Sequence, residues 1–167
     1  MAWICSTCGQ NHEDVPLSFA ADFPDNFANM SADERDARAL ITSDQCIIDE
    51  KEFYVRGLIE IPIHGEPDPF LWGVWASVSE EDFDQIHDSW QLKGRESTTG
   101  PFKGRLANGF GPYTPTTRNL KLTIKIRPVG ERPLFFLDEA DHPLGTTQRC
   151  GLTLSEAQEI ASFVLHD

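Results

Sequence analysis

Two cysteines near the start of the chain have the spacing of a metal-binding turn. Cys5 and Cys8 are separated by two residues and followed by a glycine, in the segment Cys5-Ser6-Thr7-Cys8-Gly9. Two thiolates at this spacing can bind the same ion, and the glycine lets the backbone turn tightly behind them. The segment therefore predicts that Cys5 and Cys8 bind zinc, which would help to fold the amino terminus.

A structural zinc site has four ligands, usually Cys and His side chains. His12 lies four residues after Cys8, and Cys46 lies at the start of a predicted strand. We expect these two residues to complete the shell, giving a structural zinc site of Cys5, Cys8, His12 and Cys46. The alternatives are that Cys46 is a small buried apolar residue and that His12 belongs only to a loop.

Redox and hydrolytic chemistry are the other interpretations of the cysteine pair. Redox pairs of this spacing lie between a strand and a helix in a βαβ unit, whereas Pro16 and polar residues follow this pair. A catalytic zinc keeps one position open for water, and the sequence contains no His-Glu-x-x-His motif. A metal-dependent hydrolase therefore stays the alternative, and a structural site is favoured.

Period-two alternation of apolar residues predicts the strands, and the clearest are residues 53–63 and 70–78. Turn residues at 64–69 separate these two strands, so we expect them to form an antiparallel hairpin. Further strands are predicted at 46–48, 102–106, 120–127 and 134–137.

Three helices are predicted from their start signals. Ser31 with Glu34 and Thr153 with Glu156 are capping boxes, and Ser79 precedes three acidic residues. We expect His87 and His166, on the second and third of these helices, to be surface residues. Strands and helices do not alternate regularly, which predicts an α+β fold: an antiparallel sheet with a few packed helices and an N-terminal zinc-knuckle segment.

Composition predicts one globular domain over residues 1–167, with residues 1–16 forming the knuckle segment that packs on the α+β body. Hydrophobic residues make up 40% of the chain and charged residues 25%. No apolar run approaches the roughly 20 residues of a membrane helix, and the amino terminus lacks the features of a signal peptide. We therefore expect a cytoplasmic protein that does not contact a membrane.

Charge is distributed unevenly along the chain, whose formal net charge is −13. Residues 91–132 contain nine basic and two acidic residues, which gives +7, and the remainder of the chain carries −20. Lys121, Lys125 and Arg127 alternate along one predicted strand and form a line of candidate anion-binding residues. The net negative charge repels nucleic acid at long range. We therefore favour the interpretation in which these cations face solvent or acidic residues of the same molecule.

Several short motifs resemble a bacterial family catalogued as domain of unknown function 2199. They include Cys5-Ser6-Thr7-Cys8-Gly9, Trp72-Gly73-Val74-Trp75 and Asp141-His142-Pro143-Leu144, and the resemblance covers nearly the whole chain. It implies a single-domain bacterial protein with no assigned activity, and it groups Cys5, Cys8, His12 and Cys46 at matching motif positions.

The function expected from the sequence is that of a noncatalytic binding or interaction protein. It would bind zinc for structural reasons and engage a partner protein through its acidic surface, as small acidic toxin-neutralising proteins do. The alternatives are a nucleic-acid or polyanion-binding module that uses the basic segment 91–132, and a metal-dependent hydrolase.

Overall fold

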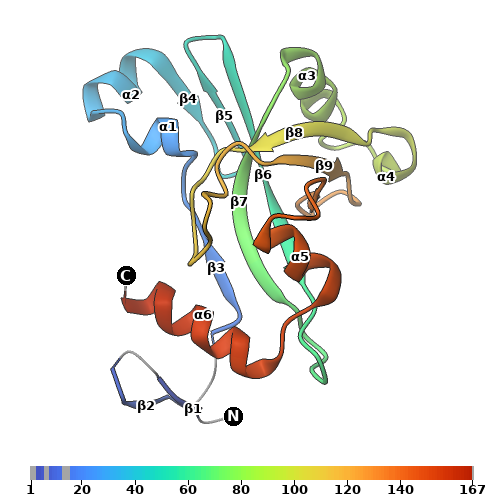
Figure 1. Cartoon of the computed structure of the whole chain (residues 1–167). Helices are drawn as coiled ribbons and strands as arrows, with labels where there is room; N and C mark the ends of the chain where they lie inside the picture. The colour runs from blue at the N-terminus through green and yellow to red at the C-terminus, as the bar shows by residue number, and fades with distance from the viewer. Residues whose placement is uncertain (1–2, 6–7, 13–15, 167) are drawn as a thin grey trace.

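The computed structural model describes residues 3–5, 8–12 and 16–166, which form a mixed α+β structure (Figure 1). The strands are β1 (Trp3–Ile4), β2 (Asn11–His12), β3 (Ser18–Ala20), β4 (Ala39–Ile41), β5 (Gln45–Ile48), β6 (Glu52–Ile61), β7 (Phe70–Val78), β8 (Phe102–Leu106), β9 (Lys121–Lys125) and β10 (Leu134–Leu137). The helices are α1 (Asp25–Ala28), α2 (Ala32–Arg38), α3 (Glu80–Asp88), α4 (Arg95–Thr98), α5 (Pro143–Cys150) and α6 (Leu154–His166).

Strands β6 to β10 close into a five-stranded barrel. Successive strands from β6 to β10 pair antiparallel, and β10 then pairs with β6 in parallel through Leu134 and Leu58. A closed ring with an odd number of strands must contain a parallel pair, because strand direction cannot alternate all the way round. The expectation of a purely antiparallel sheet is therefore corrected to a mixed sheet.

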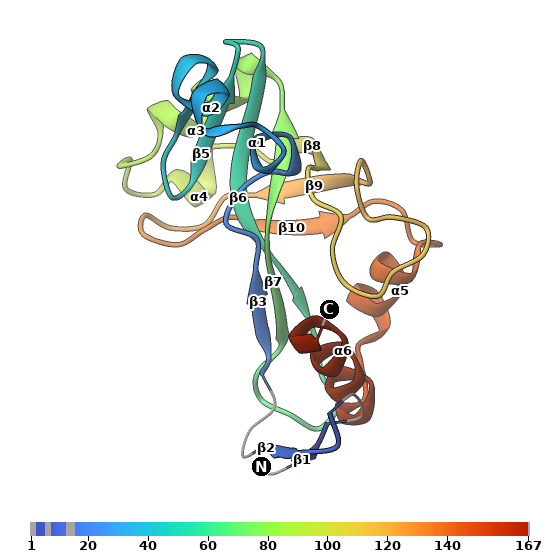
Figure 2. The ribbon, with the colours of Figure 1, turned by 90° about the vertical axis from the view of Figure 1, so that its left-hand side faces the viewer.

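Three more strands extend this sheet beyond the barrel. Strand β5 pairs antiparallel with the first half of β6, and β4 pairs with β5. Strand β3 lies parallel to the first part of β7, so it forms the second parallel pair. Strands β1 and β2 form a separate hairpin at the opposite end of the molecule from β4 and β5 (Figures 1 and 2).

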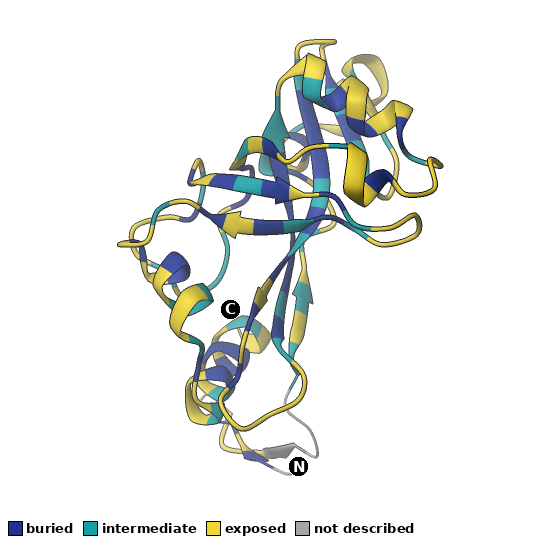
Figure 3. Cartoon of the chain, turned by 90° about the vertical axis from the view of Figure 1, so that its right-hand side faces the viewer, coloured by how far each residue is buried: buried dark blue, intermediate teal, exposed yellow. Residues whose placement is uncertain are grey.

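The longest hairpin of the barrel, β6–β7, contributes one face of alternating residues to the main core. The β6–β7 pairing runs from Phe53–Val78 to Ile61–Phe70, which confirms the predicted hairpin. One face of these strands is buried in the main core, visible as the dark blue segments of the central strands (Figure 3). The opposite face of β7 buries Trp75 in a second core with Tyr54 and Cys46.

The helix start signals also match the structure. Ser31 and Glu34 form the reciprocal hydrogen bonds of a capping box at α2. Thr153 and Glu156 do the same at α6, with both bonds at 3.1 Å. None of the helices in the described part of the chain is both long and apolar enough to cross a membrane.

Helix α5 was not expected from the sequence, and a histidine begins it. The His142 Nδ1 atom accepts a hydrogen bond from the Leu144 backbone N–H at 3.1 Å, and its Nε2 atom lies 2.8 Å from the Pro115 carbonyl oxygen. This buried imidazole is therefore an N-cap that also joins α5 to the 107–120 loop.

The closure of the barrel depends on a position that has no side chain. A Cβ atom added at Gly57 of β6 would lie 2.4 Å from the Phe135 ring and 2.8 Å from the Pro133 carbonyl oxygen. These two residues bring β10 onto β6, so any larger residue at position 57 would force the strands apart.

We expect Gly57→Ala to lower the free energy of unfolding by about 3 kcal/mol, because the extra methyl group overpacks the core at the closing strand pair. Gly109→Ala is the control, since its Cβ would lie 3.2 Å from the Thr116 hydroxyl oxygen at an exposed position. We expect a change of less than about 1 kcal/mol for the control. Urea denaturation measures both values, and equal losses in the two variants would contradict this view of the closure.

Candidate metal centre

A short hairpin shapes the segment that contains the two N-terminal cysteines. Strands β1 and β2 pair Trp3 with His12 and Ile4 with Asn11. Beyond the paired residues, the Cys5 N–H donates to the Gln10 carbonyl and the Gly9 N–H donates to the Cys5 carbonyl, both at 2.9 Å. Gly9 has a φ of 70°, in the left-handed region that glycine adopts without strain. This turn returns the chain so that Cys8 lies near Cys5.

The hairpin rests on the C-terminal helix through one of its faces. Trp3 and Cys5 are buried in a small cluster with Ala161 of α6, whereas Ile4 between them is 73% exposed. Period-two alternation in β1 therefore directs the Cys5 thiol toward α6. There the Cys5 Sγ atom lies 3.3 Å from the Ser162 hydroxyl oxygen, and Ser162 is itself buried.

His166 joins the two cysteines from the last turn of α6. It lies four residues after Ser162 and therefore on the same side of the helix. The Sγ atoms of Cys5 and Cys8 and a ring nitrogen of His166 all lie within 4.8 Å of one another. Tetrahedral zinc with Zn–S bonds of about 2.3 Å separates its sulfur ligands by about 3.8 Å, so an ion would require the sulfur atoms to approach by at most about 1 Å.

The accessibility of the three donors differs. The Cys5 side chain is fully buried, whereas Cys8 and His166 are exposed. One side of the cluster is thus fixed by the core, and the other side is open to an ion arriving from solvent. Two thiols and an imidazole are a donor set that favours zinc.

The four residues predicted as zinc ligands do not all lie together in the structure. It brings Cys5 and Cys8 together, and it places the His12 backbone opposite Trp3 in the hairpin, with the His12 side chain outside the described part of the structure. Cys46 lies on β5 opposite Tyr54, in the second core at the far end of the sheet (Figure 1). His166 is exposed, as expected for a surface residue, and it is the residue that the structure brings beside Cys5 and Cys8.

Cys46 is fully buried in that second core. Loss of hydration raises the pKa of the Cys46 thiol to about 12, and the nearby charge of Glu52 adds to this effect. Without a bound metal, the thiol is therefore protonated at neutral pH. Its surroundings in the second core are those described by the alternative interpretation, a small buried apolar residue. Cys150 is exposed at the end of α5.

The sequence analysis did not identify the two residues of α6, Ser162 and His166, that lie at the candidate metal centre. Ser162 interrupts the apolar face formed by Ala157, Ile160 and Ala161, and His166 follows it one turn later. A buried serine in register with a histidine is the signal that could have indicated a polar site on this helix. The sequence contains nothing that connects these residues to the N-terminal cysteines.

The candidate anion-binding residues lie mostly on the outside of the barrel. Lys121 and Lys125 are exposed on β9, and the strand register places Arg105 of β8 opposite Lys121. Arg127 follows the strand, donates to the Arg132 carbonyl at 2.6 Å and lies 3.6 Å from the Glu131 carboxylate.

The outer face of β8 and β9 is not uniformly basic. Lys103 of β8 lies opposite Thr123, and its ammonium group is 3.1 Å from the Asp138 carboxylate. The remaining line of cations consists of Arg105, Lys121 and Lys125.

Comparison with known families identifies the chain. The profile of the family described as "Uncharacterized protein conserved in bacteria (DUF2199)" matches residues 4–152, and the protein belongs to this family. The matched residues include Cys5 and Cys8 and end just before α6, so Ser162 and His166 lie beyond them. No curated protein and no solved structure matches the chain.

Zinc affinity distinguishes the ligand set that the structure brings together from the set predicted from the sequence. If the cluster binds zinc, Cys8→Ser and His166→Ala should each lower the affinity by at least about 100-fold, whereas Cys46→Ala should retain it. Cys150→Ser is the control for removing an exposed thiol. Competition with a colorimetric chelator measures the affinities, and loss of zinc in Cys46→Ala with retention in His166→Ala would contradict the structural assignment.

Proposed function

We propose that the protein is a noncatalytic interaction protein whose two chain ends are joined by a structural zinc ion. Cys5, Cys8 and His166 bind the ion, and His12 supplies the fourth ligand. The observation that carries the proposal is the convergence of three donor atoms within 4.8 Å from two segments at opposite ends of the chain.

The local structure supports a stabilising role for this ion. A hairpin with two residues in each strand is not stable by itself in water. The described contacts of this hairpin with α6 centre on the cluster of Trp3, Cys5 and Ala161, which is small compared with the main core. Zinc binding contributes directly to folding, so the ion would fix the hairpin and the last turn of α6 at once.

Ser162 supports the thiolate form of Cys5. Its hydroxyl group lies 3.3 Å from the Cys5 sulfur in a fully buried position. When Cys5 is ionised on metal binding, this hydroxyl can donate to the sulfur and stabilise its negative charge.

Whether His12 is the fourth ligand distinguishes a structural zinc site from the site of a hydrolase. With His12 bound, the ion has four protein ligands and no position for water. His12→Ala should then weaken zinc binding about as much as His166→Ala does. Full retention of zinc in His12→Ala would instead indicate the open coordination position that a hydrolase needs.

The distribution of charge supports an interaction role. The residues outside 91–132 carry −20, so most of the molecule presents an acidic surface. Such a surface attracts basic partner proteins and increases their rate of association, as it does in toxin-neutralising proteins.

Removal of the ion should loosen only the two chain ends. We expect chelator treatment to increase amide hydrogen exchange in residues 3–12 and in the last two turns of α6, whereas β6 and β7 stay protected. Hydrogen-exchange mass spectrometry with and without a chelator measures this change. Cooperative exposure of the whole chain, or an unchanged pattern in zinc-depleted protein, would count against the proposed role.

A second candidate function is polyanion binding by the outer face of the barrel, and the alignment of Arg105 with Lys121 favours it. In that case Lys121→Glu with Lys125→Glu should shift elution from heparin to much lower salt, because fewer phosphate or sulfate contacts form. Lys51→Glu with Lys93→Glu changes the charge equally at other exposed positions and should have little effect. Failure of the wild-type protein to bind heparin at low salt would remove this candidate.

A further inference from the structure

A groove opens beside the contact between β10 and β6 that closes the barrel. Strands β10 and β6 pair only at Leu134 and Leu58, and beyond this pair they diverge. The edge of β10 is then completed by α5: the Leu137 N–H donates to the Gln148 side-chain oxygen, and the Gln148 amide group donates to the Phe135 carbonyl, both at 2.8 Å. The side-chain amide of Gln148 thus occupies the position that the next peptide group of β6 would take in a continued parallel ladder.

The facing edge of β6 keeps one unpaired peptide position. The Leu58 N–H points away from β7 and donates to the Pro133 carbonyl, and four residues later the Pro62 carbonyl accepts from the Leu152 N–H at 2.7 Å. Backbone groups two residues apart in a strand point to the same side, so the N–H and C=O of Glu60 also point away from β7, as those of Leu58 do. Among the described residues they have no hydrogen-bond partner, so they face the groove as a donor and an acceptor.

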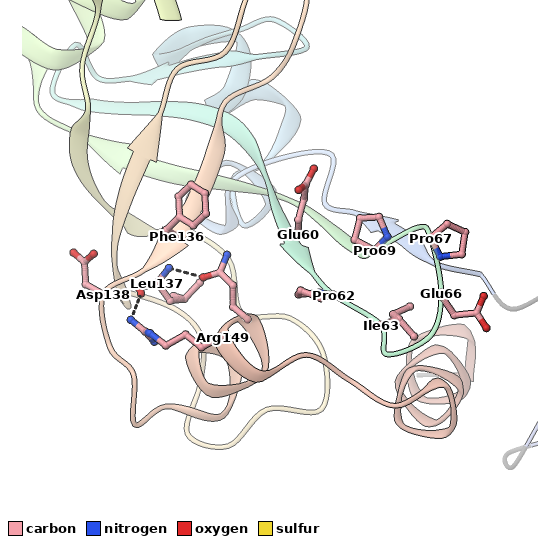
Figure 4. Close-up of a pocket in the computed structure, with 11 residues that line it drawn as sticks. Glu60, Pro62, Ile63, Glu66, Pro67, Pro69, Phe136, Leu137, Asp138 and Arg149 are labelled. Atoms are coloured by element: carbon pink, nitrogen blue, oxygen red, sulfur yellow. Dashed lines mark hydrogen bonds between the residues drawn. The ribbon is translucent and has the colours of Figure 1, made fainter. Parts of the chain in front are cut away.

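The groove lies between β10, α5 and the turn that joins β6 to β7 (Figure 4). Its volume is about 650 Å³, within the range of about 300–1,000 Å³ that is usual for binding sites. Its lining residues are Glu60, Pro62, Ile63, Glu66, Pro67, Pro69, Phe136, Leu137, Asp138, Gln148 and Arg149.

The charge of this lining is mainly negative. Glu60 and Glu66 are exposed acidic residues at two places along the groove, and Asp138 lies at its other end (Figure 4). Arg149 is the single basic residue in the lining, and its guanidinium group donates to the carbonyl oxygens of Leu137 at 2.8 Å and Gly145 at 3.3 Å. The free carboxylates of Glu60 and Glu66 therefore set the local charge.

The groove also offers an aromatic surface. The Phe136 side chain is 43% exposed, and in Figure 4 it projects from β10 to the same side as Glu60 projects from β6. An aromatic face beside carboxylates suits the aliphatic stem of lysine or the guanidinium plane of arginine. Pro67 and Pro69 form a stiff wall near Glu66.

We propose that this groove binds an extended, basic segment of a partner protein. One peptide group of the segment would hydrogen-bond with the backbone of Glu60, while its cationic side chains would lie against Phe136 and the carboxylates of Glu60 and Glu66. The inference rests on the proposed role as an interaction protein and adds the place of contact and the chemistry of the partner.

A fluorescein-labelled nonapeptide of alternating lysine and valine tests the inference by fluorescence anisotropy at about 0.15 M salt. We expect saturable binding that Glu60→Gln with Glu66→Gln weakens at least about fivefold, and that Phe136→Ala also weakens. Glu80→Gln with Glu81→Gln removes the same charge from the exposed start of α3 and should change the affinity less than about twofold. A peptide with glutamate in place of lysine should not bind.

Three outcomes would overturn the inference. They are the absence of saturable binding to the wild-type protein, equal weakening by the two pairs of glutamine substitutions, and equal binding of the glutamate peptide. Zinc affinity is measured on the same variants and should not change in Glu60→Gln with Glu66→Gln. A protein that binds zinc as proposed but not the peptide refutes only the groove, and one that binds the peptide but no zinc refutes only the metal centre.

Discussion

Closure of a barrel with an odd number of strands is the constraint on which the rest of this structure depends. It requires one parallel contact, and β10 meets β6 in parallel through Leu134 and Leu58. The close approach is possible because Gly57 leaves room for the Phe135 ring. The two strands then diverge, so the polar edge of β10 needs another partner, which Gln148 of α5 supplies. The position of α5, and the groove beside it, follow from this closure.

The chain ends are organised by a different interaction, outside the barrel. Trp3 and Cys5 are buried against Ala161 of α6, and this contact places Cys8 and His166 beside the Cys5 sulfur. The apolar contact is small, and a two-residue hairpin is not stable by itself, so the ligand bonds of the proposed ion would add stability at this position. The proposed metal centre and the proposed docking groove are therefore separate features, one stabilising the chain ends and the other presenting a surface.

Charge in the folded molecule is less segregated than it is along the sequence. Residues 91–132 are strongly basic, yet Arg95 is buried and donates to backbone carbonyls, and Arg127 is held by Glu131 and the Arg132 carbonyl. Lys103 contacts Asp138. Much of the basic segment thus serves the structure itself, and among the acidic residues that line the groove Asp138 is paired with Lys103, whereas Glu60 and Glu66 are exposed.

The sequence by itself determined the local features of this protein: the period-two faces of β6 and β7, the capping boxes at Ser31 and Thr153, and the turn that brings Cys5 near Cys8. These depend on hydrogen bonds and side-chain alternation within a few residues, which residue types report directly. Only the tertiary structure decided that His166 rather than Cys46 joins the cysteines, that the sheet is mixed, and that a groove opens beside Glu60. Such contacts join residues far apart in the chain, and barrel closure and packing against α6 set them, so no local pattern encodes them.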